Sequence, residues 1–431
     1  MTTVVAPEPG GLVDTPTPVQ ARISWKAPIT YGVLGLLSLL CFGVFTPGGH
    51  TSTFVVSTAA DAVQIAPVVV PSRTSVVLLS LVVLAAAAYA AWAASRRRHV
   101  GAWLPVVVGA GVVLSFLVWA AAGKERPITF TTLLVSGLVL SLPLVFGAMA
   151  GLLCERSGII NIAIEGQLLG GAFLAAVVAT VAGNPYAGLV AAPLAGVLVA
   201  ALLAWFSITY RVNQIIVGVV LNVLVIGLTS FLFSAVLSQD IGGLNSPGRL
   251  PTLPIPFLSE IPVLGPVLFR QNILVYLMFV TVAVLQVMVF RSRWGLRMRS
   301  VGEHPKAADT VGIDVNRTRW RNTLLGGAVA GLGGAAFTIA AGLSFQKEMT
   351  GGKGYIALAA MILGRWSPNG ALAAAVLFGF ADTLRVGLSL VNTGVPSQFL
   401  AMLPYLATIF AVAGLVGRVR PPAAEGVPYP K

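Results

Sequence analysis

Ionisable and amide side chains inside apolar stretches are the residues of this sequence that could handle a polar solute. Glu165 follows Asn161 by four residues, so the two side chains share one face of a helical start. A carboxylate is costly in lipid, and Glu165 should therefore face protein or water. It could line a solute path, or it could form a helix-end or inter-helix bond with Arg156 or Ser157, since the helix dipole favours an acid in the first turn. The sequence leaves both interpretations open.

A second set of polar groups shares one apolar segment. It comprises Asn213, Gln214, Asn222 and Thr229. Such side chains either bond between helices or line a polar conduit for a hydroxyl-rich solute, and neither interpretation is favoured. Further along, Asp382 and Arg385 lie three residues apart, and we expect them to pair with each other in a structural role.

The elements that position these residues are predicted to be membrane-spanning helices. The chain is 57% apolar and 10% charged, whereas a soluble domain carries about 25% charged residues. Its net charge is +13, but the basic residues flank apolar segments, which favours lipid head groups over nucleic acid. The sequence contains neither a GxxxxGK(S/T) phosphate loop nor a metal-ligand spacing. We therefore predict a membrane protein that is not an enzyme and binds no cofactor, metal or nucleic acid.

A spanning helix needs roughly 20 apolar residues, and the chain offers twelve candidate segments. They are residues 28–46, 75–94, 102–122, 128–152, 161–182, 186–207, 214–237, 272–290, 322–343, 354–364, 370–390 and 397–416. The tenth is short and bounded by glycine, so it is expected to be a half-helix or to extend into its flanks. With the N-terminus inside and the spans alternating, most basic residues face the cytoplasm, which favours an N-in, C-in orientation.

The two halves of the chain are expected to form an inverted repeat. Residues 102–237 and 272–416 each hold five spans, in opposite orientations. Each half has a glycine-rich break after its second span, at 155–166 and at 349–364. Interrupted segments at matching places in two inverted halves point to a solute site at the repeat interface.

The predicted fold is an all-α polytopic membrane protein with a ten-helix core at 102–418, built as a five-plus-five inverted repeat. An extra two-helix hairpin at 28–101 precedes the core. Residues 1–27 should be a disordered cytoplasmic tail, and 419–431 should be a second cytoplasmic tail. The candidate path residues come from both breaks and the seventh span: Asn161, Glu165, Asn213, Gln214, Asn222, Thr229, Lys353 and Tyr355.

Two loops are long enough to meet other proteins. Residues 291–321 are rich in arginine and lysine, as cytoplasmic loops are. Pro305 can open a short surface helix there and Gly312 can close it, which suits docking to another subunit, unless the loop only fixes topology. The connection 238–271 is rich in proline and should form a structured external cap, unless it is a passive linker.

Four ordered segments resemble the permease subunits of nucleoside-type ABC importers, which are related to ribose and branched-chain amino acid permeases. They are GLLCERSGIINIAIEGQLLGGAF, VNQIIVGVVLN, RSVGEHPKAADTVGIDV and GGKGYIALAAMILGRWSPNGALAAAVLFGFADTLR. The resemblance covers about residues 130–416. It implies that the loop helix couples the permease to an ATPase through Gly302, Glu303, His304, Pro305, Lys306, Ala307, Ala308, Asp309 and Gly312. His304 need not be the determinant, since the family often has another polar residue there.

The resemblance also implies partners and a location. The expected partners are an ATP-binding subunit that holds ATP and magnesium, a second permease subunit (a paralogue or a copy of this chain) and an external substrate-binding lipoprotein. The expected location is a bacterial-type inner membrane, crossed several times. The implied function is ATP-driven import of nucleosides, with this chain forming the translocation path.

Other functions remain open at this stage. Simple sugars or other small polar solutes are the alternative cargo for an ABC permease. An ion-coupled secondary transporter is less favoured, because that class needs ionisable groups deep in the bundle, and only Glu165 and Asp382 qualify. A membrane scaffold whose polar residues only pack helices is the third alternative.

Overall fold

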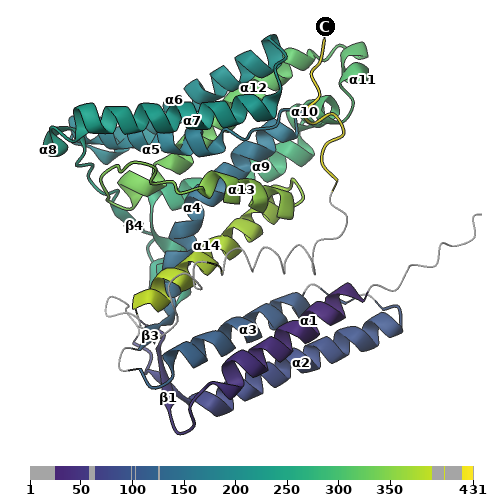
Figure 1. Ribbon diagram of the computed structural model, residues 1–431, viewed down its shortest axis with the longest axis vertical. Helices are drawn as coiled ribbons and strands as arrows, with labels where there is room; N and C mark the ends of the chain where they lie inside the picture. The colour runs from purple at the N-terminus through teal and green to yellow at the C-terminus, as the bar shows by residue number, and fades with distance from the viewer. Residues whose placement is uncertain are drawn as a thin grey trace, which may run out of the picture. The chain divides into compact units, whose positions relative to one another are not determined.

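The chain forms two compact units in the computed structural model (Figure 1). One unit comprises Met1–Gly48 and Arg73–Trp119, and the other comprises Gly49–Ser72 and Ala120–Lys431. The residues that the structure describes are 25–57, 64–98, 100–101, 103–124, 127–390, 402 and 420–430.

The described part of the first unit consists of three helices. They are α1 (Lys26–Leu37), which a π-helical turn extends to Val44, α2 (Ser72–Ser95) and α3 (Trp103–Ala121). Tyr31, Val83 and Leu104 belong to its buried apolar core. Ser38 and Ser80, both buried, share a hydrogen bond of 2.8 Å between α1 and α2.

The frame of the second unit, within its described residues, consists of eight helices, whose arrangement Figure 1 shows. They are α4 (Phe130–Glu155), α5 (Ile164–Val181), α6 (Pro185–Ala204), α7 (Gln214–Leu232), α9 (Ile273–Arg291), α12 (Val315–Gly334), α13 (Lys353–Leu363) and α14 (Pro368–Leu390). Three shorter helices lie in the connections: α8 (Ile241–Leu244), α10 (Arg293–Glu303) and α11 (Pro305–Thr310).

Helices α4 and α12 are central to this frame. α4 packs against α12, α13 and α14, and α12 packs in turn against α5 and α6. Glycine permits the close approach. A Cβ built on Gly196 of α6 would lie 2.0 Å from the carbonyl oxygen of Gly327 on α12, and one built on Gly334 would lie 2.1 Å from that of Leu168 on α5. A larger residue at either glycine would force the helices apart.

Short strands outside the helices depart from the all-α prediction. β1 (Thr51–Val55) pairs antiparallel with β2 (Val68–Pro71) and parallel with β3 (Ile128–Thr129). β4 (Thr252–Pro254) pairs antiparallel with β5 (Arg270–Asn272). The strands are only two to five residues long, so a search for long apolar segments passes over them.

Ten helices of the described chain are long and apolar enough to cross a membrane, and each coincides with a predicted span. The predicted segment 354–364 matches α13, which is shorter, as its glycine boundaries suggest. The predicted segment 397–416 and most of the predicted tail 1–27 lie outside the described residues. The protein is thus a mostly helical, polytopic membrane protein.

The basic loop 291–321 is more ordered than the sequence suggested. The predicted surface helix is confirmed as α11, with Pro305 as its first residue and Gly312 just beyond it at φ +83°. The preceding helix α10 was not predicted. The sequence did hold signals for α10: a serine before the helix and apolar residues three apart within it. In the structure Ser292 caps the helix by accepting the amide of Gly295, and Met298 and Val301 form one buried face.

Candidate functional site

Glu165 joins the two glycine-rich breaks. It lies in the first turn of α5, is 4% exposed, and accepts three hydrogen bonds from the segment that opens α13. The hydroxyl of Thr350 and the amide of Gly352 donate to Oε1 at 2.6 and 2.8 Å, and the amide of Gly354 donates to Oε2 at 2.6 Å. These amides have no partner within α13, and the helix dipole favours a carboxylate there. Glu165 therefore caps α13 from the other half of the chain.

Glu165 makes a helix-end and inter-helix bond, as one of the two sequence interpretations proposed, but its partners are not the expected Arg156 or Ser157. Arg156 donates from Nε and Nη2 to the carbonyl oxygen of Trp366, at 3.0 and 2.8 Å. Ser157 donates to the carbonyl oxygen of Cys154 at 2.7 Å. The true partners of Glu165 lie some 185 residues away along the chain, which local spacing could not indicate.

Asn222 on α7 brings a third helix to the same place. Its Oδ1 accepts the amide of Gly166 at 2.8 Å, and its Nδ2 donates to the carbonyl oxygen of Ile162 at 2.9 Å and to the hydroxyl of Tyr355 at 3.1 Å. Asn222 is 1% exposed, whereas Tyr355 is 47% exposed. One buried amide thus links the starts of α5 and α13, while the tyrosine ring keeps an open surface.

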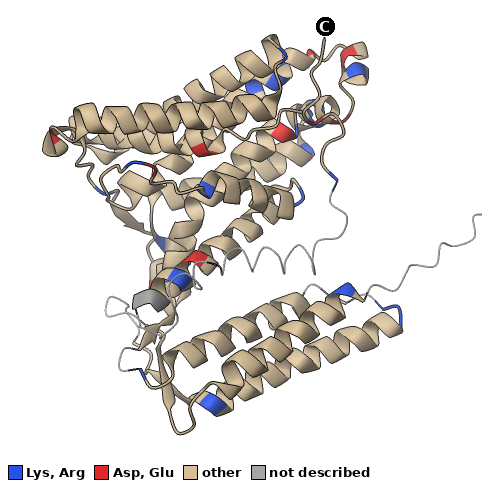
Figure 2. Cartoon of the chain, viewed as in Figure 1, with Lys and Arg blue, Asp and Glu red and all other residues tan. Residues whose placement is uncertain are grey.

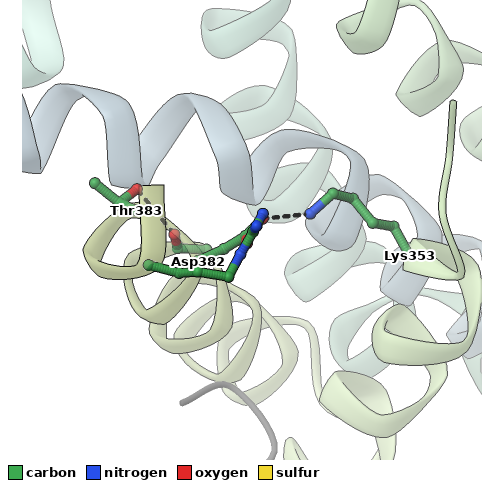
Figure 3. A network of polar contacts seen from close by, with 5 residues as sticks. Lys353, Asp382 and Thr383 are labelled. Atoms are coloured by element: carbon green, nitrogen blue, oxygen red, sulfur yellow. Dashed lines mark hydrogen bonds and ion pairs between the residues drawn. The ribbon is translucent and has the colours of Figure 1, made fainter. Parts of the chain in front are cut away.

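An ion-paired cluster continues from α13 to α14 (Figure 3). Lys353, the first residue of α13, reaches toward Asp382, and Nζ lies 2.6 Å from Oδ2. Arg385 binds the other oxygen through Nε and Nη2, each at 2.8 Å. The predicted pairing of Asp382 with Arg385 is confirmed, and Lys353 is a third member that was not predicted. The aspartate is shared by two cations, so it holds the start of α13 against α14.

Asn161 and Gln214 lie beside this place and make local bonds. Asn161 is fully buried and exchanges hydrogen bonds with the amide of Gln167, at 3.0 and 3.3 Å. Gln214 accepts the amide of Ile160 at 2.7 Å, and its buried Nε2 has no partner among the described residues. Both side chains fix the turn between α4 and α5.

The other two candidates on α7 bond within their own helix. Asn213 caps the helix start, because its side-chain oxygen accepts the amides of Ile215 and Ile216. The hydroxyl of Thr229 donates to the carbonyl oxygen of Val225 at 2.7 Å. These two residues do not contact the cluster around Glu165 in the described bonds.

The bonds of Glu165 and Asn222 form a joint between the starts of α5 and α13 and the helix α7. The site can therefore hold these helices together and also present a polar surface. The buried side chains of Glu165, Asn222 and Asp382 are bonded to groups on or beside α5, α13 and α14. The more open members are the phenol of Tyr355, the ammonium of Lys353 and the guanidinium of Arg385. These groups offer hydrogen-bond donors to hydroxyl and carbonyl groups. No cluster of side chains suited to a metal ion occurs in the part of the chain that the structure describes.

A buried pair near the end of α4 was missed by the sequence reasoning. The indole of Trp366 donates to Glu155 Oε2 at 2.6 Å, and both side chains are buried. Arg365 and Trp366 adopt positive φ, at 58° and 50°, in the turn between α13 and α14. The sequence marks this turn by Pro368 and Gly370, but not the bond that crosses to α4.

The predicted coupling segment presents only one face. His304 Nδ1 caps α11 by accepting the amide of Ala307 at 3.2 Å. Ala307 is exposed, whereas Ala308 is 2% exposed and packs with Val301 and Val315. The exposed residues between Glu303 and Gly312 are Glu303, His304, Lys306, Ala307, Thr310, Val311 and Gly312. Figure 2 shows that acidic and basic residues gather around α11 and that most of the long helices carry few charges.

Residues 133–413 match the family described as branched-chain amino acid transport system / permease component. The guanosine ABC transporter permease protein NupQ of Bacillus subtilis is 37% identical over 68% of this chain and 95% of its own length. The nucleoside ABC transporter permease protein NupC of Lactococcus lactis is 38% identical, over 70% and 98%. The putative glucose ABC transporter permease protein TsgC13 of Haloferax volcanii is 34% identical, over 64% and 88%. No solved structure matches the chain. With its apolar helices and matched core, the chain belongs to this family of transport-system permease components.

Proposed function

We propose that the chain is the membrane-spanning permease subunit of an ATP-driven importer of nucleosides. The relatives named as guanosine and nucleoside permeases align with this chain over 95% and 98% of their own length, which supports nucleosides as the cargo. The observation that carries a transport role is the joint at Glu165, where two interrupted segments from opposite halves meet inside a bundle of apolar helices.

The helix packing supports the five-plus-five repeat. Exchanging α4, α5 and α6 for α12, α13 and α14 groups the six largest packings among these helices, apart from those between exchange partners, into three pairs. α12 packs on α6 as α4 packs on α14, α5 packs on α6 as α13 packs on α14, and α12 packs on α5 as α4 packs on α13. α4 and α12 pack on each other, as do α5 and α13, as expected for pairs astride a two-fold axis. We assign an N-in, C-in orientation, which puts α10 and α11 in the cytoplasm.

The solute path runs past the open side of the joint. A nucleoside offers ribose hydroxyls and base edges, which can bond to the side chains of Tyr355, Lys353 and Arg385. Glu165 and Asn222 hold the joint rather than the solute, because their polar atoms are already engaged. Asn161 and Gln214 brace the turn behind it, and Asn213 and Thr229 belong to α7 alone.

The exposed face of α11 docks the ATPase, which holds ATP and magnesium. A second permease subunit completes the membrane part, and an external lipoprotein delivers the solute to the 238–271 side. The chain is multi-pass in the bacterial-type cytoplasmic (inner) membrane. The relatives NupP and NupB, which are 25% and 26% identical, are permeases from the same organisms as NupQ and NupC, and they support a paralogue as the second subunit.

Sugar transport is the second candidate, because the putative glucose permease TsgC13 is 34% identical. An ion-coupled carrier is disfavoured, since Glu165 and Asp382 are both held by several donors.

Reconstituted vesicles test the proposal. The permease pair, the ATPase and the binding lipoprotein are placed in liposomes with ATP, and uptake of labelled guanosine, uridine and glucose is compared. We expect nucleoside uptake that needs ATP and the binding protein. Glucose uptake without nucleoside uptake would favour the second candidate, and uptake that persists without ATP would overturn an ABC mechanism.

A further inference from the structure

The C-terminal segment 420–430 lies against the coupling helices as a strap, with a turn at residues 423–426. It opens with two prolines, which cannot continue a helix, and Pro422 and Ala424 are buried. The amide of Ala424 donates to the carbonyl oxygen of Gly302 on α10 at 2.8 Å, and the amide of Ala423 donates to Glu303 Oε2 at 3.3 Å. The strap is thus bonded to the end of α10, directly before α11.

A side-chain bond fixes the strap to α11 itself. The hydroxyl of Tyr429 donates to Asp309 Oδ2 at 2.9 Å, and Tyr429 packs against the cluster of Val301, Ala308 and Val315. The buried side of α11 therefore rests partly on a residue that lies 120 positions further along the chain.

The strap also reaches the turn between α4 and α5. The amide of Gly426 donates to the carbonyl oxygen of Gly158 at 3.2 Å. Arg319, which is only 2% exposed, donates from Nη1 to the carbonyl oxygen of Val427 and from Nε to that of Ser157, at 2.8 and 3.2 Å. Glu425 is partly buried beside Glu155 at the end of α4, and burial raises the pKa of the Glu425 carboxyl. A single segment thus bridges the coupling helices and the turn that leads to Glu165.

We propose that residues 420–430 are a coupling strap that transmits the position of α11 to the α4–α5 turn, with Tyr429 as its positioning residue on Asp309. This inference rests on the proposed function, because coupling has meaning only if an ATPase docks on α11. The strap bonds to α10 and α11 on one side and to the α4–α5 turn on the other. That turn leads into α5, whose first-turn residue Glu165 caps α13.

The test is the number of nucleoside molecules imported per ATP hydrolysed, measured in the reconstituted full complex. Three variants break the strap: a stop codon at Arg420, Ala424→Pro, which removes the amide donor, and Tyr429→Phe, which removes only the hydroxyl. Tyr210→Phe, which removes the hydroxyl of an exposed tyrosine outside the strap, is the matched control for Tyr429→Phe. We expect the ratio to fall between about two- and thirty-fold in the strap variants and to stay unchanged in the control, since mutations along a coupled network change coupling by about 0.5–2 kcal/mol.

The outcomes separate the two proposals. If the unsubstituted complex imports no nucleoside, the proposed function fails. If it imports nucleoside and the strap variants keep its transport-to-hydrolysis ratio, only the strap is overturned. Should the truncated chain not accumulate, Tyr429→Phe decides alone, and an unchanged ratio in that variant overturns the strap. Hydrogen exchange in the unsubstituted complex gives an independent check, because free-peptide exchange rates at Ala424 and Gly426 would also overturn it.

Discussion

Glu165 shows how a carboxylate can be accommodated inside a membrane bundle. Glu165→Gln keeps one acceptor oxygen for Thr350 and Gly352 but turns an amide nitrogen toward the donor of Gly354. We expect the substitution to lower the stability of the complex by about 2 kcal/mol, because charge-assisted bonds are lost and a buried donor is left unpaired. Thermal unfolding in detergent measures this effect. Glu260→Gln, on an exposed acid, is the control.

The interpretation of Glu165 as a cap depends on that stability loss. An unchanged unfolding midpoint together with lost uptake would instead assign Glu165 to the solute.

Asp382 should matter more than either of its cations. Asp382→Asn leaves Lys353 and Arg385 without their common counter-charge, whereas Lys353→Met leaves Asp382 paired with Arg385. We expect losses of between about 1 and 3 kcal/mol for Asp382→Asn and less for Lys353→Met, because the pair lies between the exposed and buried limits. Unfolding of both variants in detergent gives the ranking. Equal losses would mean that the Lys353 bond alone holds α13 to α14.

At the scale of elements, α11 places two adjacent alanines in different environments, because Ala307 is exposed and Ala308 is buried. Ala307→Arg adds charge and bulk to the exposed face, so we expect normal folding but loss of the ATPase during purification. Ala308→Arg would bury an unpaired charge among Val301 and Val315, so we expect loss of stability by at least about 2 kcal/mol. Yield and ATPase content of the two purified variants measure the difference. An Ala307→Arg variant that keeps its ATPase and its uptake would show that α11 does not dock there.

Elements were predictable where one physical signal dominates. Apolar length fixed the ten long helices, and the Pro305 and Gly312 pair fixed α11. The helix α10 was missed because its buried face is short and its arginines dominated the composition. The strands β1 to β5 were missed because their pairing depends on loops that meet only in the folded chain. The Asp382 to Arg385 pair was predictable from helical spacing, whereas the bonds of Glu165, Asn222 and Trp366 join residues far apart in sequence.

At the scale of the whole molecule, the second unit is held together by bonds between segments that lie far apart in the sequence. The joint at Glu165 connects segments from different halves of the chain, the cluster at Asp382 connects α13 to α14 within one half, and the strap at 420–430 connects the end of the chain to α10 and α11. The long separations of the bonds made by Glu165 and by the strap explain why the sequence indicated the places of the breaks but not these bonds. Local spacing carries information over one or two helical turns only.

The charges around the joint have an electrical consequence. Glu165 and Asp382 carry two negative charges, and Lys353 and Arg385 carry two positive ones, so the group is neutral as a whole. A charge moved across the membrane changes in energy by about 2.3 kcal/mol per 100 mV. A neutral group carrying an uncharged nucleoside should move without that cost, so we expect uptake rates to be independent of an imposed potassium diffusion potential in vesicles with valinomycin. Asp382→Asn, which leaves one net positive charge, should make the rate depend on voltage; a voltage-dependent rate in the unsubstituted complex would mean that charge moves with the solute.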